Sequence, residues 1–302
     1  MNQQTLGFIG LGNMGGRMCK RLVGAGWQVL GYDPSAGRAE AAGAQPVASL
    51  AEAMAAEVVL LSLPDSRVVE AVVEGEGGLL AHARAGQIVV DLSTAAASST
   101  IRLQQRFAER GVHYVDAGIS GGAAAADKGT LTLMVGGETA AVQALEAVFA
   151  PFSSKVVHMG ASGTGHTTKL LNNFLNAVSL AATAEVMVAG KKAGLDLRQL
   201  LEVINASSGV NFASLNRFPK IIEGDYLEGG LTGQLMTKDV VLYIERAREL
   251  GVASLNASGP LASFGLQTAL GYGGLISNRV VDAIGDMAGG VRLHEPLKEQ
   301  SA

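Results

Sequence analysis

The first half of the chain alternates short apolar runs with stretches in which apolar residues recur every three or four positions. The apolar runs predict β-strands, and several of the stretches between them predict helices. The predicted strands are Leu6–Ile9, Gln28–Tyr32, Val58–Leu63, Ile88–Leu92, Val112–Asp116, Leu131–Val135 and, last in this half, Val156–His158. The predicted helices are Met14–Ala25, Val68–Val73 and Ser98–Arg110. Such alternation is typical of a mostly parallel sheet covered by helices on both faces.

The pattern changes after Gly160, where the strand signal fades and helical spacing takes over. Thr168–Ala193 predicts one unusually long helix. Further helices are predicted at Leu197–Asn205, Thr237–Leu250 and Leu261–Leu270, with Gly194 and Gly251 as helix stops. We therefore expect an α/β domain over residues 1–163 and an all-α domain over residues 164–302, joined by the long helix.

The composition is that of a folded protein. Hydrophobic residues make up 48% of the 302 positions and charged residues 17%, which excludes intrinsic disorder for most of the chain. The formal charge of −4 provides no basic footprint, so nucleic acid is not an expected partner. The single cysteine, Cys19, excludes an intrachain disulfide and a Cys-cluster zinc site, and we expect a buried structural thiol. His113, His158 and His166 show no HxxH spacing, so no metal is predicted.

The sequence contains no signal for a membrane. No apolar run approaches the ~20 residues that a membrane-spanning helix needs. The chain enters an apolar strand within a few residues of its start, without a basic region or a small-residue cleavage site before it. We therefore expect a cytoplasmic protein with no membrane partner.

A glycine-rich motif, Gly10-Leu11-Gly12-Asn13-Met14-Gly15, lies between the first predicted strand and the first predicted helix. Gly10 permits a tight turn, Gly12 lets the backbone approach a pyrophosphate, and Gly15 allows the helix to pack closely on the strand. The amides at the helix N-terminus are then available to anionic phosphates. The motif alone is weak evidence, but its place in a strand–turn–helix unit predicts a Rossmann-type dinucleotide-binding domain.

The second predicted strand is followed by Asp33, at the spacing where an acidic residue accepts hydrogen bonds from the adenosine ribose. Its carboxylate would repel a 2′-phosphate, which favours NAD over NADP. Arg38 lies close enough downstream to keep NADP as the alternative. Asp33-Pro34-Ser35 also has the sequence of an ordinary turn, so a purely structural role for Asp33 stays open.

Two further segments follow predicted strands at the carboxyl edge of the sheet, where open α/β sheets bind their ligands. They are Leu63-Pro64-Asp65 and Ser93-Thr94. Leu63, Pro64 and Thr94 are therefore candidate cofactor contacts, and an ordinary turn is the alternative for each segment.

Several motifs together resemble the β-hydroxyacid dehydrogenase family, which includes 3-hydroxyisobutyrate dehydrogenase and tartronate semialdehyde reductase. Gly7–Gly15 is similar to the family's cofactor signature, and Asp116–Gly122 (DAGISGG) is similar to its substrate-binding motif. Gly160–Asn173, with the spacing GxxGxGxxxKxxxN, resembles its catalytic motif, and Lys238-Asp239 matches its cofactor-side lysine motif. These matches occur in the right order over nearly the full chain.

The chain departs from the family pattern at two places. The family usually has Pro-Val where this chain has Gly118-Ile119, and a proline where this chain has Ala97. Glycine is conformationally freer than proline, so we expect a differently shaped substrate loop. The departures therefore bear on the identity of the substrate more than on the chemistry.

The resemblance implies that Lys169 is the general acid and base. Oxidation of an alcohol needs a base for the hydroxyl proton, and a lysine whose pKa is lowered in a desolvated cleft can serve both directions. Asn173, four residues later on the same helix face, can hold the substrate hydroxyl or the lysine. Lys238 is implied to line the nicotinamide side or to neutralise a carboxylate. Asp239 either orients Lys238 or caps its helix.

The motif Ser120-Gly121-Gly122 offers a hydroxyl and backbone N–H groups to an anion, and a substrate carboxylate is the natural ligand. The alternative for this motif is an ordinary turn. For Lys169 and Lys238 the alternative is a solvated position on the surface. His166 lies three residues before the candidate lysine and is a specificity candidate only. Asn211, Phe212 and Arg217 can face the substrate, although a structural role is favoured.

The predicted function is an NAD-dependent oxidoreductase that interconverts a small β-hydroxy acid and its semialdehyde or keto acid. Two alternatives stay open: an imine reductase-like NADPH enzyme, against which Lys169 counts, and a non-catalytic dinucleotide-binding oligomerisation module. We expect a homodimer or homotetramer through the helical domain, because long apolar helices need a partner surface. The substrate itself is open among 3-hydroxyisobutyrate, glycerate, succinic semialdehyde, 3-hydroxy amino acids and sulfonate analogues.

Overall fold

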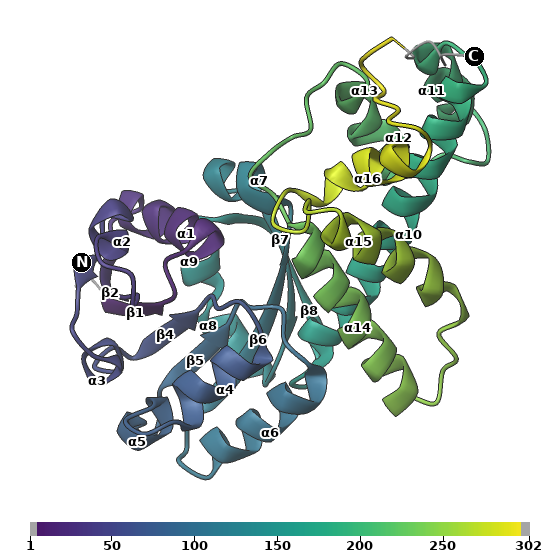
Figure 1. The fold of residues 1–302 in the computed structure, drawn as a ribbon. Coiled ribbons are helices and arrows are strands. Elements are labelled where there is room, and N and C mark those ends of the chain that lie inside the picture. Colours follow the sequence, from purple (N-terminus) through teal and green to yellow (C-terminus); the bar gives the residue numbers. More distant parts are fainter. Residues whose placement is uncertain (1–4, 297–302) are drawn as a thin grey trace. The chain divides into compact units, whose positions relative to one another are not determined.

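The computed structural model describes residues 5–296 and divides into two compact units. The first unit ends at Lys169 and the second begins at Leu170. The first contains all the strands and the second is helical (Figure 1).

An eight-stranded sheet forms the centre of the first unit. Its order is β3-β2-β1-β4-β5-β6-β7-β8, and neighbouring strands are parallel except for β6 and β7. The strands are β1 (Thr5–Ile9), β2 (Gln28–Tyr32), β3 (Gln45–Pro46), β4 (Val58–Leu61), β5 (Ile88–Asp91), β6 (His113–Ser120), β7 (Leu131–Gly136) and β8 (Ser153–Gly160). The order reverses between β1 and β4, and a ligand site is expected at the carboxyl ends of strands at such a point.

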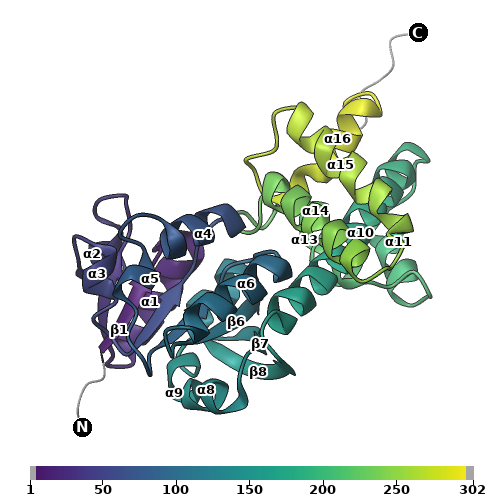
Figure 2. The same ribbon diagram turned by 90° about the horizontal axis from the view of Figure 1, so that it is seen from below.

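Helices pack on both faces of this sheet. They are α1 (Asn13–Gly24), α2 (Arg38–Ala41), α3 (Leu50–Ala53), α4 (Ser66–Glu74), α5 (Leu79–His82), α6 (Ala97–Ala108), α7 (Gly122–Lys128), α8 (Thr139–Ala144) and α9 (Glu146–Phe149). Figure 2 shows α8 beside β8 at one edge of the sheet. Because side chains alternate along a strand, β1 contributes Phe8 to one apolar core and Ile9 to the other. Cys19 of α1 lies fully buried in the first core, as predicted.

The second unit is built on the long helix α10 (Thr164–Lys192), which begins in the first unit. The other helices are α11 (Leu197–Asn205), α12 (Phe212–Asn216), α13 (Phe218–Ile221), α14 (Gly233–Glu249), α15 (Ser258–Ala269), α16 (Val280–Met287) and the short 3-10 turns η1 (Leu255–Ala257) and η2 (Ser277–Arg279). α15 packs against both α14 and α16 (Figures 1 and 2). Phe218, Met236 and Phe264 are fully buried in its core. Within residues 5–296 no helix has the length and apolar character needed to cross a membrane.

The predicted fold class is confirmed: an α/β Rossmann-type part followed by an all-α part, with a long helix between them. β2 and α11 have the predicted bounds, and Gly194 and Gly251 follow helix ends with φ of 76° and 71°. One prediction was wrong in a way that matters for the site. β6 continues to Ser120 instead of ending at Asp116, because its last residues pair with β7. Gly118 therefore lies inside a strand opposite Met134 and not in a loop.

Candidate active site

The glycine-rich turn joins β1 to α1. Gly10 has φ of 87°, and a Cβ on Gly15 would lie 2.0 Å from the carbonyl oxygen of Gly10. At Gly12, by contrast, the atom nearest to an added Cβ is Arg38 Nη1 at 3.7 Å, so the space over this residue is open. Gly12 is also the N-cap of α1 and brings no capping side chain. The N-terminus of this 12-residue helix therefore has no capping side chain and faces open space at Gly12, which fits a dinucleotide pyrophosphate.

Asp33 lies directly after β2 and holds this turn. Its Oδ2 accepts a hydrogen bond from the backbone N–H of Leu11 (2.8 Å), and its Oδ1 accepts one from Ser35 N–H (2.9 Å). Arg38 Nη1 lies 3.4 Å from both carboxylate oxygens. Burial opposes ionisation of Asp33, but the two backbone N–H groups and the Arg38 charge outweigh it and lower its pKa. Asp33 is therefore both the structural turn residue and a fixed negative charge bonded to Leu11 of the glycine-rich turn.

The loops after β4 and β5 are tied together. The Leu63 N–H donates to Ser93 Oγ (2.9 Å), and the Ser93 N–H donates to Asp91 Oδ1 (3.0 Å). Ser93 is buried, so its hydroxyl serves this link. Leu63, Pro64 and Thr94 lie in these two loops at the carboxyl edge of the sheet, beyond the ends of β4 and β5.

The substrate motif of the sequence turns sharply from β6 into α7. Gly121 and Gly122 have φ of 128° and 66°, and a Cβ on Gly121 would lie 2.5 Å from Ala125 Cβ. Both glycines are exposed, so their backbone is accessible, while Ser120 is half-buried. Arg17 on α1 forms an ion pair with Asp127 on α7. This pair places the helix of the glycine-rich turn next to the helix of the substrate motif.

Lys169 lies directly over Gly118. A Cβ on Gly118 would be 2.6 Å from Lys169 Cβ and 3.2 Å from its Cγ, so the lysine stem occupies the space that a side chain would need. Gly118 and Ser120 are two residues apart in β6, and side chains two apart point to the same face of a strand. The lysine stem and the Ser120 hydroxyl therefore share one face of β6.

Asp116 fixes the beginning of the helix that carries Lys169. Its Oδ1 accepts from Gly163 N–H (2.7 Å) and its Oδ2 from His166 N–H (2.8 Å), and the carboxylate is fully buried. Two of the amides that a helix start leaves without partners are satisfied in this way. The residue sits in the motif singled out from the sequence, but its capping role was not anticipated.

The ring of His166, a specificity candidate in the sequence, is enclosed between α10, α6 and β5. It is fully buried, with Nδ1 2.7 Å from Thr100 Oγ1 and Nε2 3.2 Å from the carbonyl oxygen of Asp91. Both ring nitrogens therefore serve the packing of α10 against α6 and β5. Ala97, the other departure from the family pattern, is the first residue of α6, where a proline and an alanine are both compatible with a helix start.

In the second unit, Asp239 connects two of the predicted site residues. Asn173 Nδ2 donates to Asp239 Oδ2 (2.5 Å), and Lys238 Nζ lies 3.2 Å from Asp239 Oδ1. Asn173 and Asp239 are buried, and the stacked rings of Phe174 and Tyr243 (centroids 3.7 Å apart) lock α10 to α14 beside them. Asp239 thus orients Lys238, one of the two roles expected from the sequence. It also fixes the Asn173 amide, a contact that the sequence did not reveal.

The segment after Gly209 has mixed roles. Asn211 caps α12, accepting from Ala213 and Ser214 N–H, so its role is structural as favoured. Phe212 is largely exposed, and Arg217 bonds two asparagine side chains. Across residues 5–296 no three His, Cys, Asp or Glu side chains are grouped so that they could hold a metal ion.

Comparison with known proteins gives the same picture at the level of the family. The model for the NAD binding domain of 6-phosphogluconate dehydrogenase matches residues 5–160, and the model for NAD-binding of NADP-dependent 3-hydroxyisobutyrate dehydrogenase matches residues 163–263. The chain is 36% identical over 248 residues to 2-(hydroxymethyl)glutarate dehydrogenase of Eubacterium barkeri, covering 81% of this chain and 82% of that protein. It is 36% identical over 280 residues to the NAD-dependent L-serine dehydrogenase of Pseudomonas aeruginosa, covering 89% and 94%.

Solved structures agree. Mycobacterium tuberculosis 3-hydroxyisobutyrate dehydrogenase with L-serine superposes with a TM-score of 0.83 at 30% identity, covering 92% of this chain and 98% of that one. An imine reductase from Pseudomonas sp. reaches a TM-score of 0.62 at 21% identity, a likeness in fold alone. The chain therefore belongs to the β-hydroxyacid dehydrogenase family and is an NAD(P)-dependent oxidoreductase of hydroxy acids.

Proposed function

We propose that this enzyme interconverts a small β-hydroxy acid and its semialdehyde or keto acid, with Lys169 as the general acid and base. The observation that carries the proposal is the position of the Lys169 stem across Gly118, on the face of β6 that also presents Ser120. The substrates named for the relatives, 2-(hydroxymethyl)glutarate, L-serine and 3-hydroxyisobutyrate, share a carboxylate with a hydroxyl on the β-carbon. Lys169 as the acid/base suits the β-hydroxyl, and the turn at Ser120-Gly121-Gly122 suits the carboxylate.

The chain's own residues divide the work. The Ser120 hydroxyl and the backbone N–H groups of Gly121 and Gly122 hold the substrate carboxylate, since exposed glycine amides allow its close approach. Neutral Lys169 removes the proton of the β-hydroxyl as the carbonyl forms, and the protonated lysine returns it in the reverse reaction. Asn173, fixed by Asp239, binds the substrate hydroxyl oxygen.

The dinucleotide would be held by the glycine-rich turn (Gly10, Gly12, Asn13, Met14, Gly15), Asp33, the two loop segments Leu63-Pro64 and Thr94, and Lys238. When bound, it accepts or supplies the hydride at the substrate carbon. We propose NAD as the preferred form, because ionised Asp33, bonded to Leu11 of the glycine-rich turn, would repel a 2′-phosphate. Arg38 is already paired with Asp33, which weakens its attraction for that phosphate.

The experiment is a turnover screen with NAD and NADP against β-hydroxy acids, run on the wild type, Lys169→Ala and Lys169→Arg. The matched control is Lys155→Ala, an exposed lysine on β8. We expect NAD-linked oxidation of at least one acid and a loss of kcat of roughly 100-fold or more in Lys169→Ala, the scale of general acid–base catalysis. NAD binding without turnover of any acid, or full activity in Lys169→Ala, would contradict the assignment.

We further propose a homo-oligomer formed through the helical unit. Leu171, Leu175 and Val186 on α10 are exposed at spacings of four and eleven residues, which return to the same side of a helix. Val203 on α11 and Leu215 on α12 are exposed as well. An apolar surface of this kind is typical of a protein–protein contact.

The single cysteine and the use of a diffusible dinucleotide fit a place in the cytoplasm.

A further inference from the structure

The ring of His166 takes part in a chain of hydrogen bonds at the first turn of α10. Its Nε2 lies 3.2 Å from the carbonyl oxygen of Asp91, the last residue of β5, and its Nδ1 lies 2.7 Å from Thr100 Oγ1 on α6. A carbonyl oxygen can only accept, so Nε2 carries the proton and Nδ1 accepts from the Thr100 hydroxyl. The ring is fully buried, and this pairing fixes both its tautomer and its orientation.

A second set of contacts holds the same helical turn against β6 and β7. Asp116 in β6 accepts the N–H groups of Gly163 and His166. A Cβ on Gly165 would lie 2.4 Å from the carbonyl oxygen of Met134 in β7, so the backbone of the turn lies directly on the sheet. The turn therefore has two anchors, because Asp116 ties its backbone to β6 while the His166 ring ties it to β5 and α6.

Lys169 follows His166 by three residues and lies one helical turn further along α10, and both residues belong to the first unit. The lysine stem is so near to β6 that a Cβ on Gly118 would lie only 2.6 Å from Lys169 Cβ. A shift of the preceding turn would therefore press the stem against the strand or move it away. The contacts of the His166 ring thus bear directly on where the lysine lies.

The strand end that the ring contacts also carries one of the loops proposed to bind the dinucleotide. Asp91 Oδ1 accepts from Ser93 N–H (3.0 Å), and Ser93 Oγ accepts from Leu63 N–H (2.9 Å). Asp91 holds the His166 ring through its main chain and the loop after β5 through its side chain. A single residue therefore connects the turn that precedes Lys169 with the loops after β4 and β5.

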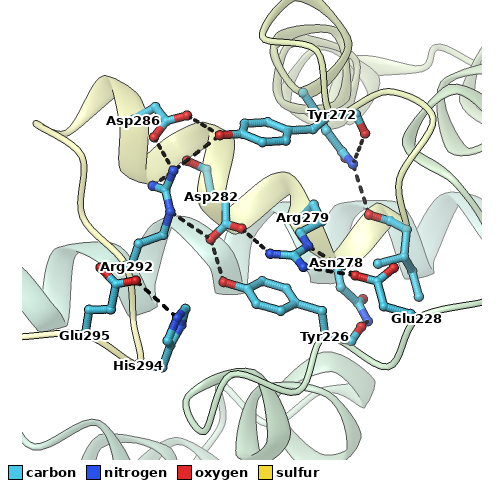
Figure 3. Close-up of polar contacts among 12 residues, drawn as sticks. Tyr226, Glu228, Tyr272, Asn278, Arg279, Asp282, Asp286, Arg292, His294 and Glu295 are labelled. Atoms are coloured by element: carbon cyan, nitrogen blue, oxygen red, sulfur yellow. Dashed lines mark hydrogen bonds and ion pairs between the residues drawn. The ribbon is translucent and has the colours of Figure 1, made fainter.

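The second unit contains a buried polar network of a different kind (Figure 3). Asp282 accepts from the Tyr226 hydroxyl (2.7 Å) and pairs with Arg279 (2.9 Å), and Arg292 pairs with Asp286 (2.6 Å). The charges of this network neutralise one another, and none of these five residues is among the proposed site residues. The Tyr226 hydroxyl therefore provides a comparison, a buried hydrogen bond whose loss should affect stability alone.

We propose that His166 is a positioning residue that sets the place of Lys169 relative to the dinucleotide loops. This inference rests on the proposed function, because it takes Lys169 as the acid/base. Proton transfer needs its two partners within hydrogen-bond reach, so a displacement of about 1 Å slows the chemical step. Substrate and dinucleotide are bound by other residues. The signature of the role is therefore a loss of kcat with little change in KM or in the NAD dissociation constant.

The test compares His166→Leu, which removes both ring hydrogen bonds, with His166→Gln, whose amide keeps one donor and one acceptor. Thr100→Val removes only the hydroxyl that bonds Nδ1 and keeps the shape of the side chain. With 2-(hydroxymethyl)glutarate, L-serine and 3-hydroxyisobutyrate as substrates, we expect His166→Leu to lower kcat by roughly 10- to 100-fold. Thr100→Val should lower it less, and His166→Gln should restore most of it. Tyr226→Phe is the matched control, which should lower the melting temperature and leave kcat unchanged.

A wild-type kcat in His166→Leu would overturn the role of His166 and leave the proposed function standing, as long as Lys169→Ala loses its activity. Equal losses in His166→Gln and His166→Leu would also overturn it, because the hydrogen bonds would then not matter. If His166→Leu does not fold, Thr100→Val decides by the same criterion. Full activity in Lys169→Ala would instead overturn the proposed function.

A second measurement needs no turnover. Acetic anhydride labels lysine amines, and mass spectrometry of the peptides gives the rate at Lys169 relative to the exposed Lys155. This ratio should differ from that of the wild type in His166→Leu and Thr100→Val, and it should be unchanged in Tyr226→Phe. An unchanged ratio in the first two variants would overturn the positioning role whether or not any of the acids reacts.

Discussion

Lys169 occupies the space that a side chain on Gly118 would need, because the missing Cβ would lie only 2.6 Å from Lys169 Cβ. Any other residue at this position forces β6 and α10 apart or turns the lysine aside. The same holds for the proline that the family usually carries there. Glycine in place of the family's proline at position 118 therefore affects how closely Lys169 approaches the strand that bears Ser120, and not the shape of a loop.

Gly118→Ala should lower kcat by about 10-fold or more, since an ångström-scale misplacement of a reacting group is costly. The NAD dissociation constant should change little, because the glycine-rich turn lies elsewhere. Steady-state kinetics and NAD titration check both values. Gly259→Ala, where an added Cβ meets nothing within 4 Å, is the control and should leave kcat unchanged. Unaltered kcat in Gly118→Ala would mean that this close approach has no catalytic meaning.

Asp116→Ala should destabilise the protein by about 2–5 kcal/mol, because it leaves the buried amides of Gly163 and His166 without acceptors. The measurement is urea or thermal unfolding. Asp196→Ala, which removes an exposed cap of α11, is the comparison and should cost about 1 kcal/mol. Similar losses in the two variants would show that burial of the Asp116 cap adds nothing.

Cys19 should be inert in the native protein. Burial raises the pKa of its thiol to about 12, so at pH 8 only about one thiol in ten thousand is ionised. Without denaturant, a disulfide reagent should label Cys19 only as fast as the protein unfolds. In urea, which exposes the thiol, labelling should be fast. The sign for stability follows: the unfolded thiol ionises near pH 9 while the folded one stays protonated, so the contribution of Cys19 is lost as pH rises from 9 toward 12. Rapid labelling at pH 8 without denaturant would contradict this burial.

Asp33 and Arg38 should act in opposite directions on cofactor choice. Asp33→Asn keeps the size of the side chain but removes the negative charge, and the ratio of kcat/KM for NAD over NADP should fall by about 10-fold. Arg38→Ala should raise that ratio by removing the cation nearest to Gly12. Kinetics with both dinucleotides measure the two ratios. If the wild type favours NADP and Arg38→Ala loses that preference, the assignment of NAD as the preferred cofactor is reversed.

Leu175→Lys should shift the protein toward a smaller species, because Leu175 on α10 is 66% exposed within the chain and apolar. Light scattering after size-exclusion chromatography gives the mass of each form. Lys192→Ala, at the end of the same helix, serves as the control. A monomeric wild type would remove the oligomer proposal.

The sequence by itself determined where many of the elements lie and which motifs connect them. The apolar runs gave β2 and α11 their bounds, and the glycine spacing located the turn at Gly10 with its positive φ, because both signals come from neighbours a few residues apart. Only the tertiary structure decided the pairings of Asp116 with His166, Gly118 with Lys169 and Asn173 with Asp239. Those partners are 50 to 66 residues apart, as the hydrogen bonds of the first and last pair show. Periodicity records which face of an element is apolar, but it does not record which residue of a distant element will meet that face.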